Sequence, residues 1–186
     1  MLLFEPLELD VCRIRLWRRE DKPALVRFGN NRKIWRNLTD LFPSPYTEVD
    51  ADAWLDLVES LDPCTHFAIE VEGLAVGGIG LIPQSGMFSG TAEFGYWLGE
   101  PYWGRGIATA AARALADFAF ANFPLARLEA GVFEWNPASM RVLEKTGFER
   151  EGVLRHSVLK DGHLVDRVMY AMTREQRKTG SGGGRP

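Results

Sequence analysis

The chain has 186 residues, of which 46% are hydrophobic, 25% charged and 11% aromatic. This is the length of a single globular domain, and such a chain can build a core without metal or disulfide support. Its 22 Lys and Arg against 25 Asp and Glu give a net charge of -3, which disfavours nucleic acid as a partner.

The cysteines and the apolar segments exclude further classes of protein. Cys12 and Cys64 belong to no C-x-x-C pair and to no zinc-binding spacing, so we interpret them as reduced, half-buried side chains. Two glutamates and a proline interrupt the first ten residues, which therefore do not form a signal peptide. Arg113 and Asp117 break the longest apolar stretch, at 107–123. We expect a cytoplasmic protein with no membrane partner.

The first third of the chain predicts one strand followed by helices. Alternation of apolar and charged residues indicates a half-buried strand, and Asp21 before Pro23 indicates a helix start. Thr47 followed by Asp50 is typical of a helix cap. The predicted elements are a strand at 11–18, two short helices divided by the Gly-Asn-Asn break at 29–31, and a helix after Thr47 that ends before Pro63.

The middle of the chain changes to a strand pattern and then returns to a helix. Short runs rich in β-branched and aromatic residues, separated by glycine-containing turns, predict an antiparallel meander. An alanine-rich segment then predicts a helix that packs closely on a sheet. The predicted elements are strands at 66–72, 75–82 and 91–98, a helix at 106–123 and a strand at 128–133.

The end of the chain predicts a short helix and a hairpin. Pro137 suits the first position of a helix, and Gly147 suits its left-handed cap. Two apolar runs, at 153–159 and 164–172, flank a Lys-Asp-Gly-His turn and predict a hairpin. The Gly/Ser-rich residues 179–186 have no apolar anchor, and we expect them to be disordered. The sequence thus predicts one mixed α/β domain at 1–178, with one sheet and helices on its faces.

A glycine-containing turn at the start of the long helix is the most informative segment. Gly104 and Gly106 let the main chain bend, and amide groups of the following helix would point at an anion near the positive end of the helix dipole. A tight strand-to-helix connection is the alternative reading. No G-x-x-x-x-G-K-[ST] motif is present, and Thr109 stands where a G-x-G-x-x-G motif has its third glycine, which argues against ATP and NAD.

Three segments together resemble a known family. They are Ala-Glu-Phe-Gly-Tyr-Trp-Leu-Gly at 92–99, Trp-Gly-Arg-Gly-Ile-Ala-Thr at 103–109, and the Asn-x-x-Ser-x-x-Val-Leu-x-Lys-x-Gly-Phe pattern at 136–148. In this order and spacing they resemble the GCN5-related N-acetyltransferases (GNAT), and within them the Rim-like branch of ribosomal-protein N-terminal acetyltransferases. The resemblance covers residues 11–173. It implies a GNAT-like fold, in which a central, mostly antiparallel sheet is splayed around a coenzyme A cleft, with helices on both faces.

The resemblance implies acetyl-coenzyme A as the co-substrate and implies no metal. The pyrophosphate would lie on the glycine turn, the pantetheine arm would pair with the main chain near Trp97 and Leu98, and Lys145 could approach a phosphate. A solvated lysine near a helix end is the alternative for Lys145. The implied coenzyme-binding residues are Trp97, Leu98, Gly104, Arg105, Gly106, Ile107, Ala108, Thr109, Asn136, Ser139 and Lys145.

The reaction also needs a base, because an amine is mostly protonated at neutral pH. Glu93 stands where the family often has its acidic residue, and a solvated strand glutamate is the alternative; Asp166 is a second candidate. Many relatives carry a tyrosine general acid at the position of Leu143, so Ser139 becomes the substitute candidate, against a simple helix-start serine. Direct transfer in a ternary complex needs no acyl-enzyme.

The sequence leaves the acceptor open. A peptide N-terminus, a polyamine or another small amine fits the resemblance, and the loops at 30–46 and 84–90 and the final hairpin would select among them. A longer acyl group is not excluded. A rival reading is an acyl-coenzyme A-binding regulatory module without catalysis, because Leu143 replaces the tyrosine. A strand edge in the final hairpin could support a homodimer.

Overall fold

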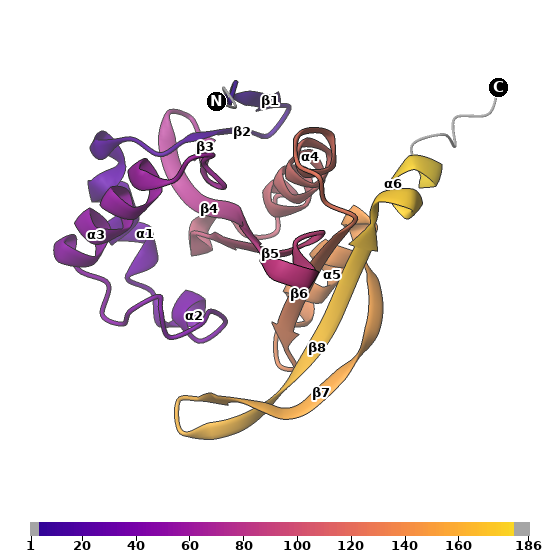
Figure 1. Cartoon of the computed structure of the whole chain (residues 1–186). Helices are drawn as coiled ribbons and strands as arrows, with labels where there is room; N and C mark the ends of the chain where they lie inside the picture. The colour runs from indigo at the N-terminus through magenta and orange to yellow at the C-terminus, as the bar shows by residue number, and fades with distance from the viewer. Residues whose placement is uncertain (1–3, 181–186) are drawn as a thin grey trace. The chain divides into compact units, whose positions relative to one another are not determined.

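The computed structural model describes residues 4–180, with side chains described as far as Arg177. In this part of the chain eight strands form one sheet in the order β1-β2-β3-β4-β5-β6-β8-β7 (Figure 1). The strands are β1 (Leu7–Leu9), β2 (Cys12–Leu16), β3 (His66–Val71), β4 (Leu74–Pro83), β5 (Thr91–Leu98), β6 (Arg127–Phe133), β7 (Glu149–Lys160) and β8 (His163–Thr173). The α-helices are α1 (Lys22–Gly29), α2 (Arg32–Trp35), α3 (Glu48–Ser60), α4 (Ile107–Asn122), α5 (Pro137–Thr146) and α6 (Arg174–Gly180).

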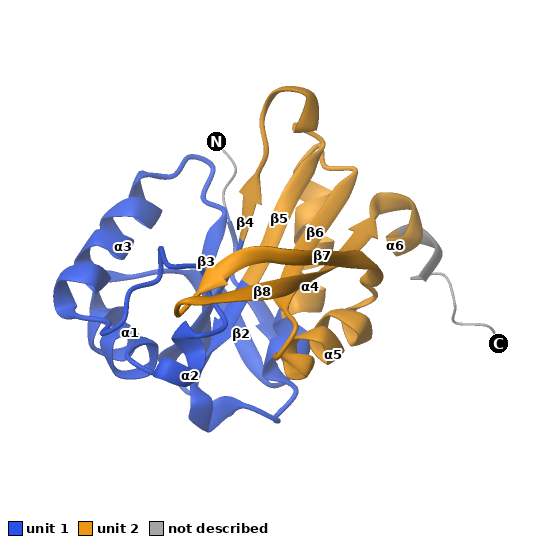
Figure 2. Cartoon of the chain, turned by 90° about the horizontal axis from the view of Figure 1, so that it is seen from below, with its two compact units in different colours: residues 1–80, 96–111 blue, residues 81–95, 112–186 orange. Residues whose placement is uncertain are grey.

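The chain divides into two compact units, which Figure 2 shows in different colours. Unit 1 consists of residues 1–80 and 96–111, and unit 2 consists of residues 81–95 and 112–186. Three elements, β4, β5 and α4, begin in one unit and end in the other. The fold agrees with the predicted mixed α/β class. The sheet is mostly antiparallel: β5 pairs with β6 in parallel, whereas the pairs β1–β2, β2–β3, β3–β4, β6–β8 and β7–β8 are antiparallel.

Unit 1 is built around an apolar cluster beneath two helices. Helices α1 and α3 lie side by side (Figure 1), as the predicted apolar spacing requires. The Thr47 side chain and Asp50 form a capping box at the start of α3, which confirms the predicted cap. The buried residues of the cluster are Trp17, Leu25, Tyr46, Ala51, Leu55, Val58, Ala68 and Ala75.

A buried ion cluster joins β2 to the segment that enters α1. The Arg15 guanidinium, with its side chain 3% exposed, donates to both carboxylate oxygens of Asp21 at 2.7 and 2.8 Å and also to Glu70. Asp21 additionally accepts the backbone N–H of Arg18 at 2.9 Å. An enclosed arginine is tolerated here because both of its carboxylate partners are fixed by the fold.

Unit 2 contains the C-terminal strands and most of α4. Ala112, Leu115, Ala116 and Ala119 of α4 are fully buried, as the predicted close packing on a sheet requires. Gly147 ends α5 with a φ of 104°, the left-handed cap expected from the sequence. The Arg174 guanidinium donates to the carbonyl oxygens of Phe120, Phe123 and Leu125, and so satisfies acceptors at the end of α4 and in the following turn.

Several boundaries differ from the sequence prediction. The predicted strand at 11–18 is the second strand of an unpredicted hairpin, because Asp10 and Val11 form a turn between β1 and β2. Strand β7 begins at Glu149, four residues earlier than expected, since β8 pairs with it along its whole length. The short helix α6 was not expected; it extends to Gly180, and residues 181–186 of the predicted tail lie outside the described residues.

The ion cluster generates a stability prediction. Asp21→Ala leaves the enclosed Arg15 with one carboxylate fewer, so the free energy of unfolding should fall by about 3 kcal/mol. Asp52→Ala is the matched control, since the Asp52 carboxylate binds the more exposed Lys22 at 2.8 Å and its loss should matter less. Denaturant unfolding of both variants measures the difference, and equal losses would contradict the assigned importance of burial.

Candidate functional site

The predicted glycine turn lies in unit 1, between the end of β5 and the start of α4. Gly104 and Gly106 have φ angles of 73° and 78°, a region that side chains other than glycine rarely adopt. A Cβ added to either residue would have no atom within 4 Å, so neither glycine is required by packing. The need for glycine is therefore conformational, and the space above the turn is open.

Backbone amide groups collect at this turn. Within unit 1 no backbone carbonyl accepts the N–H groups of residues 104–106. The next three amides, of Ile107, Ala108 and Thr109, belong to the first helical turn, whose donors have no acceptor inside the helix. The turn presents unused donors beside the positive end of a 16-residue helix, which fits an anionic phosphate group.

Trp103 holds the turn in a way that the sequence did not reveal. Its indole N–H donates to the carbonyl oxygen of Leu98, at the end of β5, over 2.6 Å. The backbone N–H of Tyr102 donates to Gly99, whose own N–H donates to Val76 on β4. These bonds tie the turn to the sheet. No pattern in the sequence signalled the indole bond.

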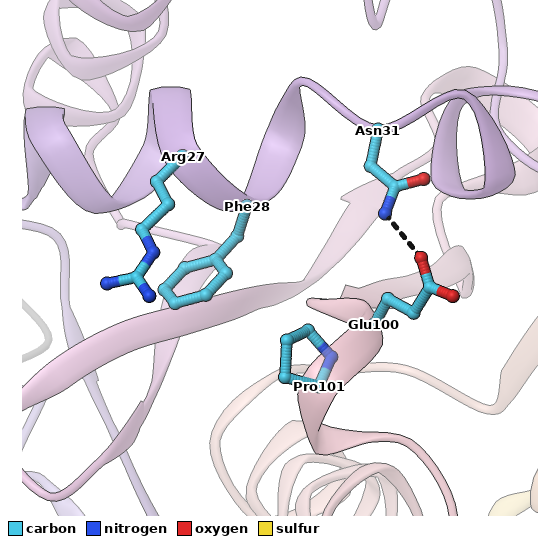
Figure 3. A pocket seen from close by; sticks show the side chains of 5 residues that line it. All are labelled: Arg27, Phe28, Asn31, Glu100 and Pro101. Carbon is cyan, nitrogen blue, oxygen red and sulfur yellow. Dashed lines mark hydrogen bonds between the residues drawn. The ribbon is translucent and has the colours of Figure 1, made fainter.

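A pocket of about 290 Å³ lies on the same unit, just before the turn (Figure 3). Residues of α1, the following loop and the short 3₁₀ helix η3 (Glu100–Tyr102) line it. The Asn31 side chain points at the Glu100 carboxylate and donates to it at 2.8 Å, and Lys33 also binds that carboxylate. These bonds lower the pKa of Glu100. None of the predicted site residues lines this pocket.

The predicted asparagine and serine lie together at the start of α5, in unit 2. The Asn136 side chain accepts the backbone N–H of Ser139 at 3.2 Å, so Asn136 is the predicted helix cap. Ser139 is half-buried. Lys145 is exposed, and its carbonyl oxygen accepts a hydrogen bond from Arg113 on α4. Leu143, at the position where many relatives carry a tyrosine, is fully buried, and its side chain has no proton to donate.

Strand β5 carries Glu93 at the point where its pairing with β6 ends. Parallel pairs are formed at Thr91, Ala92 and Glu93, and in unit 2 the pairing does not continue to Phe94. Ala92 and Phe94 are buried, and Phe94 packs on Phe148 with ring centroids 5.2 Å apart. Because side chains alternate along a strand, Glu93 lies on the opposite face of the sheet, where it is half-buried.

The second candidate acid, Asp166, already has a backbone partner. Its carboxylate accepts the N–H of His156 at 2.8 Å, at a bulge of β7 where His156 has a φ of 49°. Glu129 lies directly opposite Glu93 on β6, but its carboxylate binds Gln84 and Arg127. Glu93 has no hydrogen-bond or ion-pair partner in the described part of the chain.

The remaining chemistry-bearing groups do not form a site. Burial raises the pKa of the Cys12 thiol to about 11, and Cys64 is also shifted upwards, so neither thiol is readily deprotonated. Among residues 4–177, no group of three or more His, Cys, Asp and Glu side chains is arranged to hold a metal ion. No helix in the described range has the length and apolar character to cross a membrane.

The structure places the predicted site residues in two groups. Unit 1 holds the end of β5 and the glycine turn, and unit 2 holds Glu93 and the start of α5. The group in unit 1 comprises Trp97, Leu98, Gly104, Arg105, Gly106, Ile107, Ala108 and Thr109. The group in unit 2 comprises Glu93, Asn136, Ser139 and Lys145.

Known proteins resemble this chain over most of its length. An uncharacterized N-acetyltransferase, p20, of Bacillus licheniformis is 29% identical over 92% of this chain and 98% of its own. The spermidine N(1)-acetyltransferase of Escherichia coli K12 is 26% identical over 88% and 87% of the two chains. The solved structure of Mycobacterium smegmatis RimJ in complex with CoA-disulfide has a TM-score of 0.78 and 26% identity, covering 96% and 93%.

These comparisons agree with the three motifs and with the fold. RimJ as a structural neighbour confirms the resemblance to the Rim-like branch. The family model described as "Acetyltransferase (GNAT) domain" matches residues 12–149, which includes β5, the glycine turn and all of α5. The chain therefore belongs to the GNAT family and is an N-acetyltransferase whose co-substrate is acetyl-coenzyme A.

Proposed function

We propose that this N-acetyltransferase transfers the acetyl group to a primary amine by direct attack in a ternary complex. The acceptor is a peptide N-terminus or a small amine. The observation that carries this proposal is the run of unused backbone donors at Gly104–Thr109, followed along the chain by the Asn136-capped helix. The spermidine and RimJ relatives support an amine acceptor of either kind.

The glycine turn would hold the pyrophosphate of the coenzyme. Amide donors of Gly104, Arg105 and Gly106 and of the first turn of α4 suit a diphosphate, because several donors can converge on its oxygens. Arg105 lies over the Tyr102 ring at 5.4 Å, which keeps its charge close to the turn. The bound coenzyme supplies an activated acetyl thioester, and the turn fixes the phosphate end of that molecule.

Strand β5 and helix α5 would hold the rest of the coenzyme. The Leu98 carbonyl already accepts the Trp103 indole, so Trp97 is the better main-chain partner for a pantetheine amide. Asn136 and Ser139, held together by the cap, would contact the pantetheine and thioester end. Lys145 is exposed at the last turn of α5, where its flexible side chain could pair with a phosphate.

Glu93 would accept the proton of the amine, directly or through water. The neutral amine then attacks the thioester carbonyl, a C–N bond forms, the C–S bond breaks, and the sulfur leaves as a thiolate. The nitrogen loses a second proton as it becomes an amide, and this loss balances the proton that the thiolate takes up. Ser139 is the proposed donor for that thiolate. The two cysteines, which resist deprotonation, take no part in this sequence. Direct transfer therefore needs no acyl-enzyme intermediate.

A homodimer through the hairpin edge belongs to the same proposal. Strand β7 ends the strand order, and its residues are mostly exposed. An exposed strand of 12 residues offers unpaired backbone groups to a second copy.

The proposal is tested by calorimetric titration with acetyl-coenzyme A, followed by thiol release in the presence of single acceptors. Binding with acceptor-dependent thiol release supports the transferase and identifies its substrate class. Binding without thiol release from any peptide, polyamine or aminoglycoside would favour the regulatory module. Absence of coenzyme binding would contradict both readings.

Gly106→Val should weaken coenzyme binding without unfolding the protein. A valine resists the φ of 78°, at a cost of about 1–2 kcal/mol, so the turn should rearrange and its donors should separate. We expect the dissociation constant for acetyl-coenzyme A to rise about tenfold or more in a titration.

Gly73→Val is the matched control for this prediction. Gly73 has a φ of 81° and equally open space, but it lies in the turn between β3 and β4. Both variants should lose similar thermal stability, and only Gly106→Val should lose coenzyme affinity. Equal affinity in the two variants would remove the phosphate role from the glycine turn.

Glu93→Gln should lower turnover most strongly at low pH. The neutral fraction of an amine falls about tenfold for each pH unit below its pKa, so the base is needed most there. We expect kcat/KM for the acceptor to fall about 100-fold near pH 6 and much less near pH 9, with unchanged coenzyme affinity. Glu129→Gln, which changes the opposing carboxylate, should leave the shape of the pH–rate profile intact. A wild-type profile in Glu93→Gln would exclude Glu93 as the base.

A further inference from the structure

The sheet face that carries Glu93 also carries an arginine. Glu93 is paired with Glu129 on β6, and Phe133 of β6 is paired with Arg167 on β8. Residues two apart on one strand share a face, so Glu129, Gly131 and Phe133 lie on the same side of β6. Their partners in the register, Glu93 and Arg167, therefore lie on that face as well.

The stem of Arg167 lies across the backbone of β6. A Cβ added to Gly131 would be 2.6 Å from Cδ of Arg167 and 3.0 Å from its Cγ, closer than side-chain atoms approach each other. The arginine therefore leans from its own position opposite Phe133 back towards Glu129. Only a glycine at position 131 leaves room for this arrangement.

The guanidinium of Arg167 has no hydrogen-bond or ion-pair partner among the residues that the structure describes. Its Nε is enclosed and accepted by no oxygen, and in the described part of the chain Arg167 forms no hydrogen bond or ion pair. Enclosed donors without acceptors are costly and are rare in native proteins. Other arginines of unit 2 at comparable positions are paired: Arg127 with Glu151, and Arg174 with three carbonyl oxygens.

Arg167 and Glu93 are therefore two half-buried, oppositely charged side chains, and neither has a hydrogen-bond or ion-pair partner within the described range of the chain. Strand spacings separate the backbone of Glu93 from that of Gly131, over which Arg167 lies, by about 8 Å. The two side chains form no direct ion pair in the described residues, so both charges remain available to a small group of the acceptor. A primary amine directed at Glu93 would place neighbouring atoms of its own molecule near Arg167.

We propose that Arg167 binds a carbonyl or carboxylate oxygen of the acceptor, next to the amine that is acetylated. The acceptor is then an α-amino carbonyl compound, either a free amino acid or a peptide N-terminus, and not a polyamine. The planar, five-donor guanidinium matches such oxygens. A polyamine presents further cations and no oxygen, so an unpaired arginine would repel it. This inference rests on the proposed function and specifies its substrate class.

The test compares acceptors in the full-length enzyme with acetyl-coenzyme A, measuring thiol release. The acceptors are alanine, alaninamide, an alanine-first tripeptide and spermidine. We expect at least one of the three alanine compounds to exceed spermidine in kcat/KM by about tenfold or more. Preference for alanine identifies a free amino acid, and preference for the amide and tripeptide identifies a peptide N-terminus. A preference for spermidine would overturn the proposal.

Arg167→Met retains the stem over Gly131 and removes the donors. We expect KM for the alanine-type acceptor to rise about tenfold or more, with unchanged KM for acetyl-coenzyme A and an unchanged melting temperature. Discrimination against spermidine should shrink. Arg167→Lys should restore only part of the affinity, because an ammonium lacks the fork geometry.

Arg150→Gln is the matched control. Arg150 is exposed, and its strand partner in the register of β7 with β8 is Tyr170, so Arg150 lies on the face of the sheet opposite to Arg167. It should change none of these constants. Two results would contradict the contact between Arg167 and the acceptor oxygen. One is an equal loss of kcat/KM for the alanine-type acceptors and for spermidine in Arg167→Met, and the other is the same change in KM in Arg150→Gln as in Arg167→Met. Coenzyme binding without thiol release from any acceptor would instead count against the proposed function, and it would overturn this inference with it.

Discussion

The parallel register between β5 and β6 determines how the chemistry-bearing side chains of unit 2 are arranged. The two strands pair at Thr91, Ala92 and Glu93 and then separate within that unit. The register places Ala92 and Phe94 in the core and Glu93 on the opposite face, and a shift of one residue would exchange them. Because β6 also pairs with β8 over seven residues, the same register assigns Arg167 to the face of Glu93. A carboxylate and a guanidinium share that face as a consequence of sheet geometry.

The continuation of β5 leads directly into the glycine turn that we propose as the phosphate site. The carbonyl of Leu98, its last residue, is taken by the Trp103 indole, and the next residue, Gly99, is fastened to Val76 on β4. The turn therefore starts from a fixed point at the end of a strand, and the two glycines need only supply positive φ angles. A turn held in this way loses little conformational entropy when it binds a phosphate, and such preorganisation favours affinity.

Local patterns predicted the elements that depend on local physics. Short-range backbone requirements determine four such features, and the structure has each of them. They are the caps at Thr47 and Asn136, the left-handed glycine at 147 and the glycine turn. Three motifs in a fixed order also identified the family before any fold was known. These features need only a few consecutive residues, so one sequence is enough to recognise them.

Features that depend on pairing between distant segments were not predictable. The Arg15–Asp21–Glu70 cluster, the Trp103 bond to Leu98 and the contact of Arg167 with Gly131 all depend on register or on loop conformation. In the sequence, Gly131 is only an unexplained glycine within a strand. A glycine at such a position marks the close approach of another group, and only the folded structure shows that this group is the side chain of Arg167.

The burial of Leu143 bears on how much acid catalysis this enzyme needs. With its side chain fully enclosed, this position supplies no proton, so in the proposed mechanism the leaving thiolate depends on Ser139 or on water. An alkyl thiol has a pKa of about 8.5, so its thiolate is a moderately good leaving group at neutral pH even without a proton donor. The amine, in contrast, must lose a proton before it can attack. If Glu93 is the base, as we propose, a chain that lacks the tyrosine has lost the less demanding of the two proton transfers, which favours a working transferase over a purely regulatory module.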